Sequence, residues 1–336
     1  MNETFFSVPS DPSNVNAVLL WGLNVVRLFQ NIKSPGFTAA MTIVSDVCTG
    51  IMVPLTMIIL WCVNQKRGAR LGIVLIISAW LNAFLKSLLM QPRPFTLDAS
   101  LGLAHELSYG LPSGHAQMSL TLLILLAYWA GDKYKSKKII IWIAALFLAL
   151  LVGFSRVYLG VHFPTDLAGG WLAGGLILAL FFLGEKRLTL LLERAGKRGQ
   201  LIVIAASSLI MKFVYPEDTR LGALLLGFAG GYALLVNTFS FSASGTINGK
   251  NPSFLILVLR CFLGALGTAV VSLSLKLILP GEGSIFESVS WWGLSSPFID
   301  LGYFIRYGLL GLWISAAAPL LFGNLNLAQI QKNKEA

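Results

Sequence analysis

Long apolar stretches recur along almost the whole chain, and they constrain its fold more than any other feature. We expect about nine membrane spans, at residues 37–63, 71–90, 116–130, 139–154, 165–183, 201–214, 221–237, 254–279 and 299–322. Several are shorter than the about 20 residues that a spanning helix needs, but their ends can extend into the flanking loops. Spans must be helical, because lipid offers the backbone no hydrogen-bonding partner. The sequence therefore predicts an all-α, polytopic membrane helical bundle.

The composition agrees with a membrane protein and argues against a nucleic-acid-binding one. Hydrophobic residues make up 56% of the 336 residues and charged residues only 12%, against about 25% charged residues in soluble domains. The net charge is +10, but basic and aromatic residues are not interleaved in a polar segment. We therefore expect membrane lipids, and no nucleic acid, as partners.

Loop charges predict the orientation of the chain in the membrane. Basic residues concentrate in the loops 64–70, 131–138 and 185–200, whereas acidic residues such as Asp98 and Glu106 lie in the opposite loops. Basic loops stay in the cytoplasm. We therefore expect a multi-pass protein of the plasma (inner) membrane, with its N-terminus outside and its C-terminus in the cytoplasm. Residues 1–35 form an extracytoplasmic segment that includes an amphipathic interfacial helix.

Three polar clusters fall at the extracytoplasmic ends of the expected spans. In the first, Lys86 and Arg93 are seven residues apart, which is nearly two helical turns. Pro92 and Pro94 end the helix there and leave Arg93 at its mouth. Two such cations suggest a polar cavity. The alternative is that they extend to lipid headgroups, which for Lys86 has equal weight.

The second cluster is the sequence Pro112-Ser113-Gly114-His115 at the start of the third span. Ser113 is a suitable N-cap, and Gly114 allows an anion to approach the backbone closely. Free backbone N–H groups at a helix start bind anions. Taken alone, the sequence is better explained as a turn that begins a helix.

The third cluster contains Ser155, Arg156, His162 and Asp166. His162 and Asp166 are four residues apart across Pro164, a spacing that suits the start of a helix. A carboxylate bonded to one imidazole nitrogen fixes the tautomer and leaves the other nitrogen as a nucleophile. Arg156 adds a planar donor for phosphate oxygens. A purely structural His–Asp pair is the alternative, which the convergence of two histidines and three cations makes weaker.

Taken together, K-x6-RP, PSGH and SR-x5-H-x3-D in this order resemble the signature of the type 2 phosphatidic acid phosphatase superfamily. The resemblance covers about residues 36–184. It implies a catalytic transmembrane phosphatase core at 36–184, followed by a C-terminal transmembrane extension of unknown role at 185–336.

The resemblance also implies a role for each matching residue. His162 would attack phosphorus and form a phosphohistidine, Asp166 would orient His162, and His115 would protonate the leaving oxygen and then activate water. The remaining positions would bind the phosphoryl oxygens: Lys86, Arg93, Ser113, Gly114 and Arg156. No metal and no cofactor is expected, and the chain has no carboxylate cluster suited to Mg²⁺.

The function expected on this basis is hydrolysis of a lipid phosphate monoester or diphosphate on the extracytoplasmic face. Phosphatidic acid and polyprenyl diphosphates are the substrate types that fit best. Three alternatives stay open: a lipid phospho-group transferase that uses the same intermediate, a phosphatase for a sugar phosphate such as glucose 6-phosphate, and a transporter or scaffold that kept a phosphate site. The oligomeric state does not follow from the sequence.

Overall fold

The computed structural model describes residues 16–243, 251–289, 292–293 and 296–333. Residues 1–15 of the expected N-terminal segment lie outside this part. The chain forms two compact units: unit 1 contains Met1–Met52 and Leu81–Leu183, and unit 2 contains Val53–Trp80 and Gly184–Ala336. Val53–Trp80 thus groups with the C-terminal part, although the phosphatase core is expected to span 36–184. That functional division remains a prediction.

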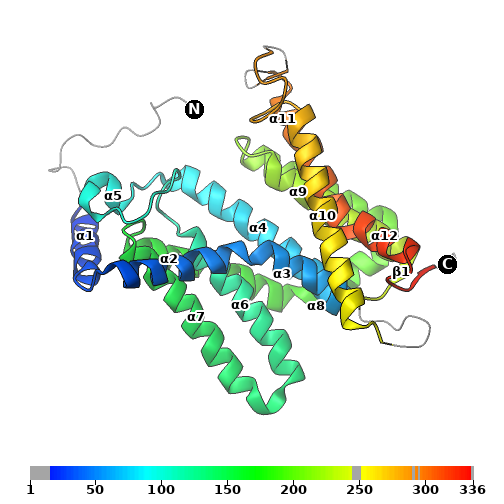
Figure 1. Cartoon of the computed structure of the whole chain (residues 1–336), viewed down its shortest axis with the longest axis horizontal. Helices are drawn as coiled ribbons and strands as arrows, with labels where there is room; N and C mark the ends of the chain where they lie inside the picture. Colours follow the sequence, from blue (N-terminus) through cyan, green and yellow to red (C-terminus); the bar gives the residue numbers. More distant parts are fainter. Residues whose placement is uncertain (1–15, 244–250, 290–291, 294–295, 334–336) are drawn as a thin grey trace. The chain divides into compact units, whose positions relative to one another are not determined.

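The described residues are almost entirely helical, as the sequence predicts (Figure 1). The helices up to the middle of the chain are α1 (Ala17–Gln30), α2 (Pro35–Gly50), α3 (Met52–Ile58), η3 (Ile59–Val63), α4 (Gln65–Leu89), α5 (Pro94–Leu97), η4 (Ala99–Leu101), α6 (Gly114–Lys133), η5 (Lys135–Lys137) and α7 (Lys138–Tyr158). The later helices are α8 (Pro164–Val214), α9 (Arg220–Thr238), α10 (Phe254–Ile278), α11 (Ile299–Leu312), η6 (Trp313–Ala317) and α12 (Ala318–Asn324). Two short strands, β1 (Phe239–Phe241) and β2 (Ile330–Lys332), pair antiparallel.

In unit 1, close backbone contact between α6 and the first part of α8 positions the polar clusters. A Cβ on Gly170 would lie 2.5 Å from the Ser113 carbonyl oxygen, and one on Gly174 would lie 2.9 Å from that of Gln117. Only glycine permits this approach, as is common between helices in membranes. The start of α8 and the start of α6 are thereby held against each other.

Helix α1 also belongs to the core of unit 1. Leu23 and Val26 are buried in one apolar cluster with Phe163, the residue after His162. The side chain of Gln30 donates hydrogen bonds to the carbonyl oxygens of Leu101 and Tyr158 at 2.9 and 2.8 Å. The helix expected near the N-terminus is present, and it supports the loops of the polar clusters. Its interfacial position stays a prediction.

Unit 2 has its own apolar core, which includes Trp61, Phe228 and Phe322. Helices α9 and α11 approach so closely that a Cβ on Gly227 would lie 1.8 Å from the carbonyl oxygen of Gly308. Glycines at this crossing therefore replace larger side chains and bring the two backbones together.

The expected loop at 185–200 is mostly helical, with a break at Gly196, which corrects the sequence-based boundary. Helix α8 runs from Pro164 to Val214, and within it Gly196 has a non-helical backbone (φ 61°, ψ −173°). The basic residues of this segment lie in helix, because long-chained Lys, Arg and Glu have good helix propensity and do not by themselves end a helix.

Among the described residues, six helices are long and apolar enough to span a membrane, or seven if the bent pair Pro35–Gly50 and Met52–Val63 forms one span. This count takes α8 as a single helix and does not include α6. The chain is therefore a multi-pass helical membrane protein, while nine spans remain a prediction.

Candidate active site

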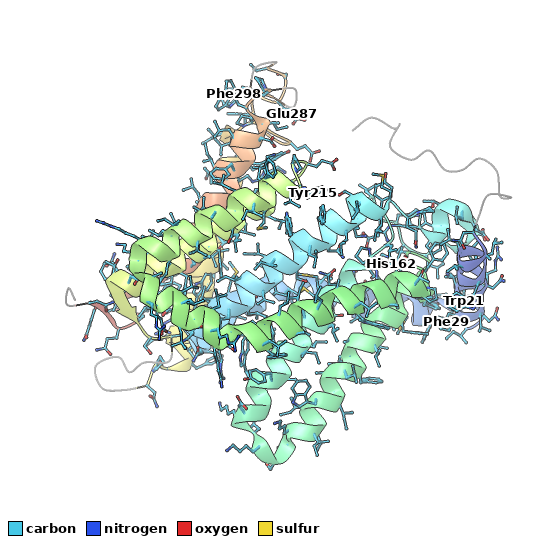
Figure 2. All side chains as sticks on the ribbon, turned by 180° about the vertical axis from the view of Figure 1, so that it is seen from behind. Trp21, Phe29, His162, Tyr215, Glu287 and Phe298 are labelled. Carbon is cyan, nitrogen blue, oxygen red and sulfur yellow. The ribbon has the colours of Figure 1, made fainter. Side chains whose placement is uncertain are left out.

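All three polar clusters lie in unit 1, at the ends of helices. Lys86 belongs to the last turn of α4, and Arg93 directly precedes α5. Ser113 caps α6, Arg156 lies in the last turn of α7, and His162 precedes α8. Figure 2 shows His162 where α8 begins. Residues distant in sequence are thus brought to one end of the helices in this unit.

His162 and Asp166 form a buried pair. Nδ1 of His162 lies 3.1 Å from Oδ2 of Asp166, and the two residues are 1% and 0% exposed. The same carboxylate accepts hydrogen bonds from the Phe163 backbone N–H at 2.9 Å and from Nε2 of Gln91 at 2.5 Å. With Asp166 fixed in this way, Nδ1 is the donor nitrogen and Nε2 is the nitrogen with a free lone pair.

Arg93 is held within hydrogen-bond distance of this unprotonated nitrogen. Nη1 of Arg93 lies 3.2 Å from Nε2 of His162 and donates to the Val161 carbonyl oxygen at 2.7 Å. Nε and Nη2 donate to the backbone oxygen and the hydroxyl of Ser108 at 2.5 and 3.0 Å. Four contacts fix the guanidinium so that an anion bound to it would lie next to the imidazole.

The electrostatics favour a neutral imidazole at His162. Burial lowers the pKa of His162 well below its ordinary value of 6.5, and the positive charges of Arg93, Lys86 and Arg156 lower it further. A positive charge on His115 would also lower the pKa of His162. A neutral imidazole is the nucleophilic form.

Arg156 is paired with the carboxylate of Glu106, which the sequence motifs do not include. It forms an ion pair with Glu106 and donates to the Ser45 hydroxyl at 2.6 Å. Oε2 of Glu106 also lies 3.8 Å from Nη2 of Arg93. The Nε of Arg156 is buried without a hydrogen-bond partner among the described residues. The guanidinium groups of Arg93 and Arg156 thus share the Glu106 carboxylate. The Nε–H of Arg156 remains available to donate to a bound anion.

Lys86 and the start of α6 are also fixed by local hydrogen bonds. The Lys86 ammonium donates to the carbonyl oxygens of Tyr109 and Gly110. The Ser113 hydroxyl accepts from the Ala116 N–H at 3.4 Å, and the Ser113 N–H donates to the Asp166 carbonyl oxygen at 2.9 Å. The N-cap role expected for Ser113 is present.

Gly114 sits where a larger residue would be crowded. A Cβ there would lie 3.1 Å from Oδ1 of Asn82. Nδ2 of Asn82 donates to the Pro112 carbonyl oxygen at 3.2 Å and to Oε1 of Gln117 at 2.9 Å. Asn82 therefore holds the turn in place, a role that its apolar sequence surroundings did not reveal.

Sequence reasoning missed several residues of the site: Ser45, Asn82, Gln91, Glu106 and Ser108. Three of them lie in the polar segment between α4 and α6, where nothing in the spacing separates Glu106 from Asp98. Among the described residues, no group of three or more His, Cys, Asp and Glu side chains could hold a metal ion. The metal-free reaction remains a prediction.

Two family models match the chain: that of the PAP2 superfamily over residues 67–189, and that of the PAP2 superfamily phosphatase transmembrane extension over residues 219–330. Phosphatidylglycerophosphatase B of Bacillus subtilis is 31% identical over 188 residues, which cover 53% of this chain and 89% of that protein. The chain belongs to the PAP2 superfamily. The resemblance seen in the three motifs is confirmed.

Other relatives match a shorter part of this PAP2 chain. The undecaprenyl-diphosphatase of Sulfolobus acidocaldarius is 34% identical, with 38% of this chain and 60% of that protein covered. Mouse sphingosine-1-phosphate phosphatase 2 is 28% identical, with 36% and 35% covered. A crystal structure of a transmembrane PAP2-type phosphatidylglycerolphosphate phosphatase from Bacillus subtilis is 29% identical, covers 52% of this chain and 89% of that one, and aligns with a TM-score of 0.47.

Proposed function

We propose that this PAP2 protein is an integral membrane phosphatase that hydrolyses a lipid phosphate monoester or diphosphate. One observation carries the proposal. The buried His162–Asp166 pair leaves Nε2 of His162 unprotonated, and the Arg93 guanidinium lies within hydrogen-bond distance of that nitrogen, at 3.2 Å. A nucleophile beside a cation is what phosphoryl transfer requires, whereas a protein that merely binds phosphate has no use for an oriented nucleophile.

The reaction proceeds in two steps. Nε2 of His162 attacks phosphorus as the bond to the leaving oxygen breaks, and His115 gives that oxygen a proton. Water then attacks the phosphohistidine, His115 takes a proton from the water, and phosphate leaves as the nitrogen–phosphorus bond breaks. Asp166 holds the imidazole and stabilises its charged form. The developing negative charge is met by the binding groups: Lys86, Arg93, Arg156, the Ser113 hydroxyl and the Gly114 N–H.

The relatives support a lipid as the substrate. They include a phosphatidylglycerophosphatase, an undecaprenyl-diphosphatase and a sphingosine-1-phosphate phosphatase. The site lies at the ends of apolar helices, where a lipid can enter sideways from the bilayer with its phosphate near headgroup level. Phosphatidic acid and polyprenyl diphosphates are the two substrate types to test first.

A phosphate-release screen with purified protein tests this function. The substrates are phosphatidic acid and a polyprenyl diphosphate in mixed micelles and glucose 6-phosphate in solution, each with and without an alcohol acceptor and with and without EDTA. Release from a lipid substrate, unaffected by EDTA, is expected. Preference for the sugar phosphate would refute the lipid assignment, and activity that depends on an acceptor would identify a transferase.

Trapping the intermediate tests the nucleophile. Brief reaction with ³²P-labelled substrate should give an acid-labile, alkali-stable label on the protein, as expected for phosphohistidine. His162→Ala should abolish the label and the activity while the protein still inserts into membranes. Undiminished labelling of that variant would exclude His162 as the attacking residue.

The same site is proposed to face the extracytoplasmic side. In a variant without its three natural cysteines, one cysteine is placed at Ser100 or at Lys135, both exposed. An impermeant maleimide added to intact cells should label the first and not the second. The reverse pattern would invert the proposed orientation.

A further inference from the structure

An apolar groove lies between α10 and α11 in unit 2. A hollow of about 370 Å³ is lined by Val270, Ser274 and Leu275 of α10, by Leu309 of α11 and by Trp313, which begins η6, among others. Val270 and Leu309 are 54% and 43% exposed. In a membrane protein, an apolar hollow with an open side between two spanning helices faces lipid tails.

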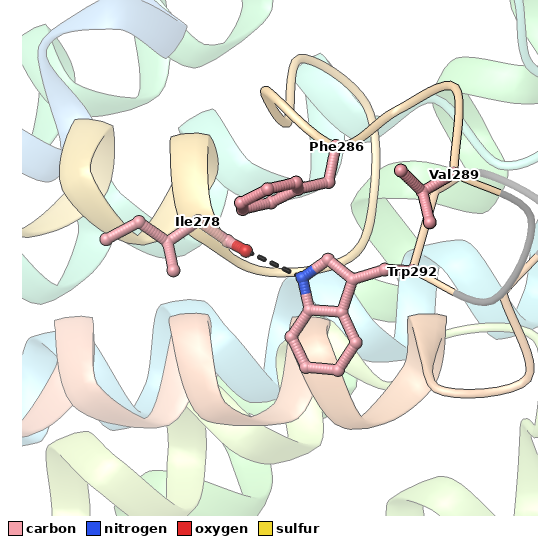
Figure 3. A pocket seen from close by; sticks show the side chains of 4 residues that line it. All are labelled: Ile278, Phe286, Val289 and Trp292. Atoms are coloured by element: carbon pink, nitrogen blue, oxygen red, sulfur yellow. Dashed lines mark hydrogen bonds between the residues drawn. The ribbon is translucent and has the colours of Figure 1, made fainter.

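A separate hollow lies further along α10, at the end of the helix. This hollow, of about 440 Å³, is lined by Ile278, Phe286, Val289 and Trp292 (Figure 3). Ile278 follows Ser274 by four residues, so both side chains lie on one face of the helix. The indole N–H of Trp292 donates to the Ile278 carbonyl oxygen at 2.8 Å and fixes the loop over this end. Tryptophan at such a position is typical of the headgroup level.

Arg306 supplies a cation on the groove face of α11. It precedes Leu309 by three residues and Trp313 by seven, and this spacing puts the three side chains on one face. The guanidinium lies 5.4 Å from the centre of the Tyr307 ring. It makes no ion pair or hydrogen bond with any residue that the structure describes. An intramembrane cation without an anionic partner is costly, so it calls for an anion from outside the chain.

We propose that the α10–α11 groove binds one anionic phospholipid of the surrounding bilayer, with an acyl chain in the groove and the phosphate at Arg306. The apolar lining fits the chain, the guanidinium fits the phosphate, and Trp292 lies where the headgroup region begins. The site is made by the transmembrane extension alone and does not depend on the reaction at His162.

A lipid explains the cation better than a second copy of the chain does. A copy packed against this face with two-fold symmetry would bring its own Arg306 to the same interface. Two of the nearby acidic side chains already have partners: Asp300 pairs with Lys212 at 3.0 Å, and Glu287 accepts from the Gly283 N–H at 3.0 Å. A phospholipid provides both the apolar chain and the missing negative charge.

Quenching of Trp313 tests the proposal. The protein is placed in phosphatidylcholine nanodiscs with an increasing fraction of phosphatidylglycerol brominated on its acyl chains. The Trp313 signal is taken as the difference between the protein and its Trp313→Phe variant. We expect saturable quenching by the brominated anionic lipid at fractions where brominated phosphatidylcholine quenches little. Equal quenching by the two lipids would overturn the proposal.

Three variants separate the site from general attraction to the membrane. Arg306→Gln should weaken the preference for the anionic lipid about fivefold, whereas Arg306→Lys should retain most of it. Lys276→Gln is the matched control, because Lys276 lies two residues before Ile278, on another side of α10, and should leave the preference unchanged. An equal loss with Lys276→Gln would overturn the proposal.

A groove-filling variant keeps the test independent of charge. Ser274→Phe should reduce quenching by occupying the groove, while the extension keeps its fold. Full quenching in this variant would place the lipid elsewhere. Shielding of Trp313 from both brominated lipids, together with a dimeric mass, would show that a second copy covers the face and would also refute the proposal.

Discussion

The carboxylate of Asp166 reaches Nδ1 of His162 at 3.1 Å across the start of α8, and the same oxygen accepts the Phe163 N–H at 2.9 Å. The helix start therefore fixes the direction of the imidazole as well as its tautomer. Asp166 acts on the reaction through His162, because its own oxygens are already engaged by protein donors.

Asp166→Asn should lower kcat by at least about a hundredfold, because the amide no longer stabilises a charged imidazole. KM should change much less, since the groups that bind phosphate are untouched. The measurement is steady-state phosphate release, with the formation rate of phosphohistidine followed by rapid quenching.

Asp98→Asn serves as the matched control, because Asp98 is another carboxylate of unit 1, between α5 and η4, that pairs with Arg27 at 2.8 Å. It should retain nearly full activity. Equal losses in the two variants would mean that the loss of any carboxylate charge in unit 1, and not the orientation of His162, lowers the rate.

His115→Ala should slow the first chemical step according to the leaving group. For a lipid alkoxide, which must be protonated, we expect a loss of about 10² to 10⁴ in phosphoenzyme formation. For p-nitrophenyl phosphate, whose phenolate leaves without a proton, the loss in that step should be far smaller. Equal losses with both substrates would refute the general-acid role.

The pH dependence of stability should report the buried state of His162. Its pKa is lowered by burial and by the charges of Arg93, Lys86 and Arg156, so the folded protein keeps it neutral below 6.5. The unfolded chain takes up a proton there. Unfolding therefore binds a proton at His162, and the contribution of this residue to stability falls as the pH drops below 6.5.

The measurement is the thermal unfolding temperature between pH 5 and pH 8 for the wild type and for His162→Gln, with tryptophan fluorescence as the signal. The variant should lose less stability at the acid end than the wild type does. A larger loss in the variant would mean that the protonated imidazole is favoured in the folded state.

The sequence predicts contacts between residues that are close in the chain, but not contacts between distant residues. The spacing of the motifs predicts the His162–Asp166 pair, because residues four apart meet at a helix start. Glu106 is different: it pairs with Arg156, 50 residues away, and only the path of the chain between α4 and α6 brings them together.

In the fold, too, local features can be predicted from the sequence and long-range contacts cannot. Apolar runs predict nearly every long helix, since hydrophobicity is a local property. They do not predict that the helix begun at Pro164 continues beyond residue 185 to a break at Gly196, or that α1 packs its Leu23 against the loop of Phe163. Both features depend on tertiary packing, which periodicity alone does not encode.

Glu106→Gln should strengthen the binding of oxyanions. In the structure Glu106 occupies the guanidinium of Arg156 and approaches that of Arg93, so phosphate must compete with it. Removing the negative charge should lower the inhibition constant of vanadate by about tenfold or more, in line with the free energy of one charged hydrogen bond of about 1.5–3 kcal/mol. Weaker vanadate binding would instead show that Glu106 is needed to orient the arginines.

The last prediction concerns Gly160, two residues before His162. Its φ is +70°, and a Cβ there would lie 1.9 Å from the Leu101 carbonyl oxygen. The left-handed backbone alone costs an ordinary residue about 1–2 kcal/mol, and the clash forces the loop to move. Because the next carbonyl, that of Val161, accepts from Arg93 at 2.7 Å, movement of the loop displaces both the nucleophile and its cation.

Gly160→Ala should therefore lower both the unfolding temperature and kcat, with kcat reduced at least about tenfold because small displacements of reacting groups are costly. The control is Gly175→Ala in α8, where an added Cβ meets no atom within 4 Å. Activity and thermal unfolding of the two variants are compared with wild type. If Gly160→Ala behaves like its control, the loop accommodates a Cβ without moving His162, and the geometry of the pair is set by Asp166 and the start of α8 alone.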